Sequence, residues 1–118
     1  MEPVNLAAKF GAITEHWSPR RVASVNDYDV RIARVRGEFV RHRHPDTDEF
    51  FLVVDGELTI RMDAGDVVLC PGEIFVVPRG VYHQPYAAVE TSILMFEPRA
   101  TVNTGDAGGP LTVAPEDL

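Results

Sequence analysis

Residues 37–56 read GEFVRHRHPDTDEFFLVVDG and place two histidines and a carboxylate, His42, His44 and Glu49, within eight residues. In an extended strand, residues two positions apart point to the same face, so the two imidazoles should lie together. The following Pro-Asp-Thr-Asp is typical of a turn, and the apolar run 50–54 indicates a strand that returns beside the first. Such a hairpin brings the carboxylate next to the imidazoles. This combination predicts a site for a first-row transition metal with open coordination positions.

A second stretch, GEIFVVPRGVYH at residues 72–83, ends in a third histidine. The two stretches resemble the paired motifs of the cupin family, G-x5-H-x-H-x(3,4)-E-x6-G and G-x5-P-x-G-x2-H-x3-N. The matching positions are Gly37, His42, His44, Glu49, Gly56, Gly72, Pro78, Gly80 and His83. Two positions depart from the motifs, because only four residues separate Gly37 from His42 and Ala87 replaces the asparagine. Neither departure removes a ligand; they affect a local bulge or turn and a structural hydrogen bond.

The resemblance implies an all-β fold, the cupin double-stranded β-helix or jelly-roll β-barrel, as a single domain over residues 1–118. It also implies one divalent transition metal per chain (Fe, Mn, Ni, Zn or Cu) near one end of the barrel. The implied ligands are His42, His44, Glu49 and His83. They would leave two positions of an octahedron free for a substrate or dioxygen. Among cupins, the chain is similar to the small bacterial group often labelled phosphomannose-isomerase-like, a label that rests on fold similarity.

The composition excludes several classes of protein. The chain has 118 residues, of which 45% are hydrophobic, enough for one domain with a core. A net charge of −7 disfavours binding to nucleic acid or to an anionic membrane. No apolar segment approaches the length of about 20 residues that a membrane helix needs. The absence of a signal-peptide pattern and the single cysteine, Cys70, predict a cytoplasmic protein without an internal disulfide.

Short strands separated by turn residues are expected along most of the chain, which is typical of a sandwich or barrel. Residues 4–13 fit either a short helix or an edge strand, and an irregular tail on the barrel surface, frayed at its end, should begin near residue 100. Cys70 lies in an apolar run and should be buried and inert. The expected strands are 29–36, 39–44, 49–54, 57–62, 67–70, 74–77, 81–85 and 91–97.

Alternation along the expected strands assigns most of the remaining polar residues. Arg41 and Arg43 should face away from the metal, and His16, which has no partner at a ligand spacing, should be a surface or loop residue. Arg31 and Arg34 have opposite parity, so one of them can reach the interior. The interior around the metal should otherwise be largely apolar, and no second acid or base is evident.

One expected strand is apolar on both faces. If Glu49 faces the interior, then Phe50, Leu52 and Val54 face outward, and a strand of this kind needs cover on both sides. The outer cover would be a second subunit, making a homodimer, or else residues 1–13 of the same chain.

Three functions fit these observations. The first is a metal-dependent enzyme of the oxygenase, isomerase, epimerase or lyase type, acting on a small molecule inside the barrel. The second is a non-catalytic module that binds or senses a small molecule through its metal. The third is a structural cupin whose metal pins the barrel.

Overall fold

The computed structural model describes all residues from 1 to 118, and these form one short helix and eight strands. No helix is long and apolar enough to cross a membrane. The elements are α1 (Leu6–Gly11), β1 (Arg20–Val25), β2 (Tyr28–Glu38), β3 (Glu49–Asp55), β4 (Leu58–Met62), β5 (Val67–Leu69), β6 (Ile74–Val77), β7 (His83–Pro98) and β8 (Glu116–Asp117).

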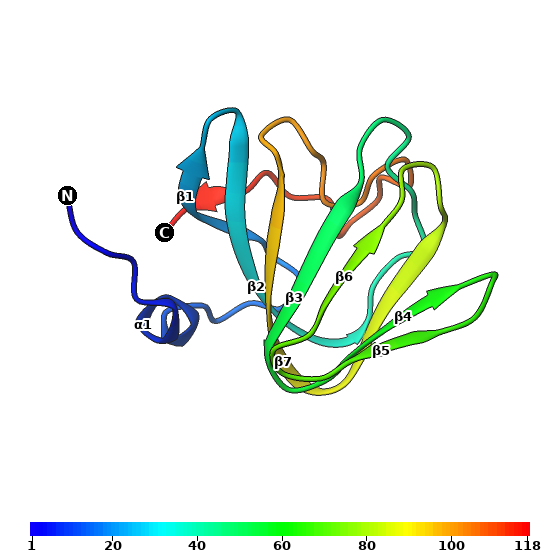
Figure 1. Ribbon diagram of the computed structural model, residues 1–118, viewed down its shortest axis with the longest axis horizontal. Coiled ribbons are helices and arrows are strands. Elements are labelled where there is room, and N and C mark those ends of the chain that lie inside the picture. The colour runs from blue at the N-terminus through cyan, green and yellow to red at the C-terminus, as the bar shows by residue number, and fades with distance from the viewer.

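The long strand β7 joins the two layers of the fold. Residues 83–86 pair with β4, and residues 92–96 pair with β3, while β2 runs along the other edge of β7. The strand order is therefore β5-β4-β7-β2-β1-β8, and β3 and β6 branch from the second half of β7. Figure 1 shows β4 and β5 splayed away from the layer formed by β1, β2, β3 and β6, so that the sheet curls without closing. This is the all-β jelly-roll architecture expected from the sequence.

The hydrophobic core fills the space between these layers. It consists of inward-facing residues that alternate with outward-facing ones along β2, β3, β4 and β7, as strands buried on one face require. Its buried members are Ala33, Val35, Phe51, Val53, Leu58, Ile60, Leu69, Val77, Ala87, Ile93 and Met95.

Two strand predictions were wrong in detail. Residues 83–85 and 91–97 belong to one strand, β7, and residues 81–82 precede it. Residues 39–44 form no strand, although His42 makes an isolated bridge to His83. Pro85 explains the second error, because it accepts a hydrogen bond from Phe39 N (2.9 Å) but has no N–H with which to continue a ladder. The chain leaves β2 after the register shift at Gly37, whose φ of +80° suits glycine.

The chain termini fold onto the sheet. Residues 6–11 form the helical alternative, capped at Asn5, whose side chain accepts from Ala8 N (3.0 Å). The helix packs Phe10 against Ile32 of β2. The tail is irregular as expected, but its end is not frayed, since β8 pairs in parallel with β1. Part of the tail is also buried rather than on the surface, with Thr104 fully enclosed.

The prediction that Cys70 is buried was wrong. Its neighbour Leu69 takes the inward position at the end of β5, so Cys70 points outward where the turn begins. Its backbone N–H donates to Glu73 Oε1 (2.8 Å). Local desolvation and the charges of Glu73 and Glu57 raise the pKa of the Cys70 thiol, which keeps it in the less reactive protonated form.

Candidate metal centre and its cavity

Four buried side chains converge at one end of the fold. His42 and His44 lie on the irregular segment between β2 and β3, Glu49 begins β3, and His83 begins β7. One nitrogen or oxygen from each lies within 4.8 Å of the others. Glu49 Oε2 is 3.3 Å from His83 Nε2 and 3.8 Å from His42 Nε2, and it contacts His44 Nε2 as well. The structure thus brings together all four residues that the sequence proposed as ligands.

Backbone carbonyls orient two of the imidazoles. His42 Nδ1 donates to the carbonyl oxygen of Val40 and His83 Nδ1 donates to that of Val81, each at 2.9 Å. These bonds place the proton on Nδ1 and leave the Nε2 lone pair facing the centre, the arrangement usual for metal-binding histidines. The Nε2 atoms of His42 and His44 are buried without a hydrogen bond. Because unpaired buried polar atoms are costly, these nitrogens fit a metal ion between them.

The cluster also has the charge that a cation needs. Burial alone would raise the pKa of Glu49, but its contacts with the three imidazoles outweigh burial and hold that pKa well below its usual value. Burial would lower the pKa of His83, but Glu49 raises it above the ordinary value. Glu49 is therefore an anion, and protons compete with a metal for the nitrogen of His83.

The C-terminal tail packs directly against the cluster, which the sequence did not predict. A Cβ at Gly105 would lie 2.2 Å from the carbonyl oxygen of Arg43 and 2.9 Å from Cδ2 of His42. Only glycine therefore allows the tail to approach so closely. Asp106 secures the contact by accepting from Arg43 N (3.0 Å) and from the hydroxyl of Tyr82 (3.1 Å).

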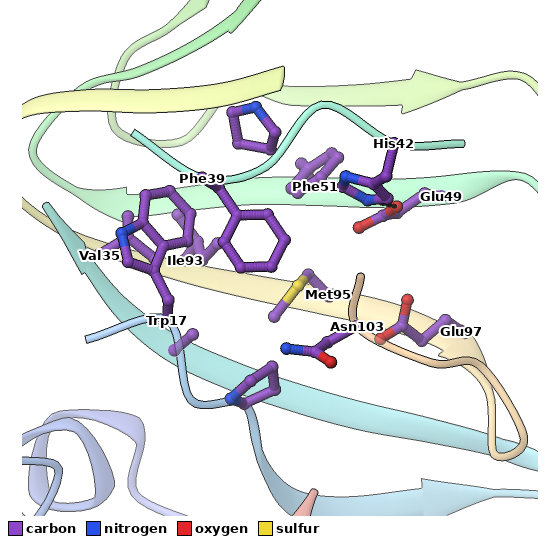
Figure 2. A pocket seen from close by; sticks show the side chains of 13 residues that line it. Trp17, Val35, Phe39, His42, Glu49, Phe51, Ile93, Met95, Glu97 and Asn103 are labelled. Carbon is purple, nitrogen blue, oxygen red and sulfur yellow. Dashed lines mark ion pairs between the residues drawn. The ribbon is translucent and has the colours of Figure 1, made fainter. Parts of the chain in front are cut away.

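A narrow cavity adjoins the cluster, and His42 and Glu49 form part of its wall. With the open solvent at its mouth the space is about 400 Å³, of which only about 30 Å³ is free for a water-sized molecule. Figure 2 shows that its two ends differ: Trp17 and Phe39 lie at one end, and Glu49 and Glu97 lie at the other. The rings of Trp17 and Phe39 stack with centroids 4.8 Å apart. The remaining lining residues are mostly apolar: Pro19, Ala33, Val35, Phe51, Pro85, Ile93 and Met95, with Asn103.

The expectation of no second acid was wrong, because Glu97 is a buried carboxylate in the cavity wall. Burial and the charge of Glu49 raise the pKa of Glu97 to about 8. Its partner is Arg31, fully buried, whose Nη1 donates to Glu97 Oε1 (3.0 Å). Arg31 is thus the arginine that reaches the interior. Arg34 forms a half-exposed ion pair with Glu90 (2.8 Å) instead.

The other assignments from alternation are confirmed. Arg41 and Arg43 face away from the cluster, with their guanidinium groups 4.3 and 5.2 Å from the ring centroid of Tyr82. His16 is exposed and pairs with Glu90 at 2.6 Å.

Three residues of the cavity, Trp17, Glu97 and Asn103, were not predicted. Glu97 could have been found, since it has the same parity as the core residues Ile93 and Met95. Trp17 and Asn103 lie in irregular segments, where no periodicity shows which way a side chain points.

Together these features define a small β-barrel protein with a buried three-histidine, one-glutamate centre. The family described as "Cupin domain" matches residues 30–97, and the chain belongs to the cupin family. The uncharacterized protein YdbB of Bacillus subtilis (strain 168) is 36% identical over 94 residues, covering 79% of this chain and 83% of YdbB. A cupin-2 domain containing protein from Shewanella frigidimarina is 45% identical with a TM-score of 0.80, covering 81% and 94% of the two chains.

More distant structures share the fold alone. Hydroquinone 1,2-dioxygenase from Sphingomonas sp. TTNP3, with 4-hydroxybenzoate bound, is 20% identical with a TM-score of 0.63. The match covers 74% of this chain and 68% of the dioxygenase chain. Another hydroquinone 1,2-dioxygenase, PnpCD in complex with Cd²⁺ and 4-hydroxybenzonitrile, is 22% identical with a TM-score of 0.64, over 85% and 69% of the chains. The phosphomannose-isomerase-like subgroup finds no support among these relatives.

Proposed function

We propose that this protein is a metal-dependent enzyme that acts on a small, largely apolar molecule carrying oxygen ligands. One divalent transition metal would be held by His42, His44, Glu49 and His83. The observation that carries the proposal is that two of these residues, His42 and Glu49, form the wall of an otherwise apolar cavity. A ligand in that cavity therefore lies against the metal with its apolar part among aromatic side chains.

The lining favours an aromatic or other apolar ring over a sugar. No lysine or arginine lines the cavity, so a sugar phosphate would find no cation there for its phosphate. The several hydroxyls of a sugar would also lose hydrogen bonds against residues such as Phe51 and Met95. Two hydroquinone dioxygenase structures of the same fold were solved with phenolic compounds, which agrees with this choice although their identity to the chain is low.

The chain's own residues supply binding, orientation and exclusion of water. A bound metal would supply a Lewis acid that favours ionisation of a coordinated hydroxyl or, for a redox metal, exchange of electrons. Val40 and Val81 hold the imidazoles of His42 and His83 in one tautomer. The stacked rings of Trp17 and Phe39 close the far end of the cavity and would position a flat ligand.

Metal analysis followed by a turnover assay tests the proposal. Protein purified without oxygen should contain one transition metal per chain, measured by elemental analysis. With that metal restored, a panel of phenols and catechols should be consumed, as followed by an oxygen electrode and by NMR. Binding without consumption would favour the sensing module, and unfolding on chelation would favour the structural role. A protein that neither contains nor takes up a metal contradicts the proposal.

We also propose that a second copy of the chain covers the outer apolar face, defined as Phe50, Leu52, Val54, Ile74 and Val76. The side chains of β3 and β6 lie next to each other there in the antiparallel pairing, and Ile74 is 58% exposed. Within the chain, α1 packs on Ile32 and Leu94, beside Leu52. Val54, Ile74 and Val76 remain exposed, which favours a second subunit as their cover. A two-fold axis lets one such patch serve both subunits.

A further inference from the structure

Glu97 lies at the metal end of the cavity, but it is not one of the four clustered residues. It is the last residue but one of β7, and its side chain is 4% exposed. The pairing of Phe50 with Phe96 places Glu49 and Glu97 opposite each other on β3 and β7 when it is extended by one residue. Figure 2 shows both carboxylates at the same end of the cavity. Glu97 therefore borders the space beside the metal.

This position is unfavourable for a carboxylate unless something compensates for it. On its other side, Glu97 pairs in register with Asp29 of β2, so acidic residues flank it on both neighbouring strands. Like charges directly opposite each other destabilise a sheet. The groups that face Glu97 are the acids Glu49 and Asp29, His44 of the cluster, and a single cation, Arg31.

Arg31 holds one oxygen of Glu97 and leaves the other free. Every N–H of Arg31 has an acceptor. Nε (3.2 Å) and Nη2 (3.1 Å) donate to Asp29 Oδ2. Nη1 also donates to the carbonyl oxygen of Thr101 and Nη2 to that of Arg99, each at 2.8 Å. The remaining N–H, on Nη1, donates to Glu97 Oε1 at 3.0 Å. Glu97 Oε2 makes no hydrogen bond with the protein. A fixed carboxyl with one unpaired oxygen in an apolar cavity is arranged to receive a donor from a ligand.

From this arrangement we infer that Glu97 is a substrate-binding residue whose free oxygen accepts a hydrogen bond from a hydroxyl next to the metal-bound oxygen. The inference rests on the proposed function, and it narrows the substrate to an apolar molecule with two adjacent oxygens, at least one carrying a proton, as in a catechol. A metal cation bound to Glu49 would offset the repulsion between the carboxylates of Glu49 and Glu97, and Arg31 favours the ionised form of Glu97. With metal bound, Glu97 is therefore a hydrogen-bond acceptor.

Two coloured probes test the inference on metal-loaded protein at about pH 9, far above the ordinary pKa of a glutamate. 4-Nitrocatechol carries both hydroxyls, whereas 2-methoxy-4-nitrophenol lacks the second donor. Wild type should bind the catechol about 10- to 100-fold more tightly in absorption titrations, the range for a hydrogen bond to a charged group. Glu97→Gln keeps an acceptor for Arg31 but presents an amide donor to the ligand, so this preference should disappear. Glu38→Gln, on an exposed carboxylate paired with Arg61 at 3.5 Å, is the matched control and should keep the preference.

The possible results separate the two proposals. A catechol preference that survives in Glu97→Gln overturns the role of Glu97 and leaves the proposed function standing. Failure of the metal-loaded wild type to bind either probe overturns both. The wild-type comparison needs no variant, so equal affinity for the two probes also overturns the role of Glu97. Glu97→Asp, which withdraws the carboxylate by one methylene, should give an intermediate preference and serves if the amide variant does not fold.

Discussion

Replacing Arg31 with methionine should be among the most damaging single changes to the metal-free protein. The variant keeps much of the side-chain volume but removes all five N–H donors, which reach Asp29, Glu97 and two backbone carbonyls. Asp29 retains Arg21 and Arg99, so the loss falls mainly on Glu97 and the carbonyls. Removing one partner of a buried ion pair costs about 3–5 kcal/mol, a large part of the stability of a typical domain.

The loss of unfolding free energy in Arg31→Met should also depend on pH, in a direction set by the raised pKa of Glu97. Its pKa in the folded protein is about 8, against an ordinary value of 4.5, so the folded state binds the extra proton. The resulting stabilisation is complete below about pH 4.5 and is lost as pH rises through about 8. Without Arg31 the pKa of Glu97 rises further, so the free-energy cost of Arg31→Met should be larger at about pH 9 than at about pH 6.

Urea denaturation at both pH values measures this cost. The matched control is Arg99→Met, because Arg99 also pairs with Asp29 (3.3 Å) but has a side chain that is 55% exposed. An exposed pair contributes about 0–1 kcal/mol, so the control should unfold nearly like wild type. Equal losses in the two variants, or a cost for Arg31→Met that shrinks as pH rises, would refute the reasoning.

Three further changes test the site and the outer apolar face. His44→Ala should weaken metal binding by more than about 100-fold in equilibrium dialysis, with little change in the melting temperature of the metal-free protein; a large drop in that temperature would show a structural role. Gly105→Ala should cost roughly 1–3 kcal/mol and also lower metal affinity, because its Cβ displaces Arg43 and His42, and an unchanged affinity would contradict this. Leu52→Asp should convert a dimer to monomers in light scattering over a dilution series, whereas a wild-type mass of 13.1 kDa at every concentration rules out the dimer.

The four clustered residues could be predicted because their spacing within two short stretches of sequence forms a recognisable pattern. The spacing of His42, His44 and Glu49 and the turn between them pointed to the cluster, and the motif ending at His83 supplied the fourth residue. The structure brings them together without the expected strand, through an irregular segment that bridges to His83 at His42. The strand expected at 39–44 failed for a long-range reason, since Pro85 of another strand interrupts the ladder opposite it.

Glu97 and the tail depend on contacts that no local pattern contains. The parity of Glu97 with Ile93 and Met95 indicates that it faces inward, but its acidic neighbours follow only from the pairing of β7 with β2 and β3, which sets Asp29 and Glu49 on either side of it. The contact of Gly105 with His42 joins two irregular segments, and irregular segments have no period from which to read the direction of a side chain.

The continuity of β7 limits how its length can vary. His83 and Glu97 face inward at opposite ends of one strand, and residues 88–90 between them skip the pairing with β2. That unpaired stretch could absorb a lost residue, whereas deleting one residue from 92–94, which pair with both β2 and β3, would leave His83 in place but turn every later side chain to the opposite face. Glu97 would then be exposed to solvent. Deleting two residues would preserve the alternation. The paired part of this strand should therefore tolerate the loss or gain of two residues better than of one. A change of one residue would keep His83 at the metal site but remove Glu97 from the cavity wall.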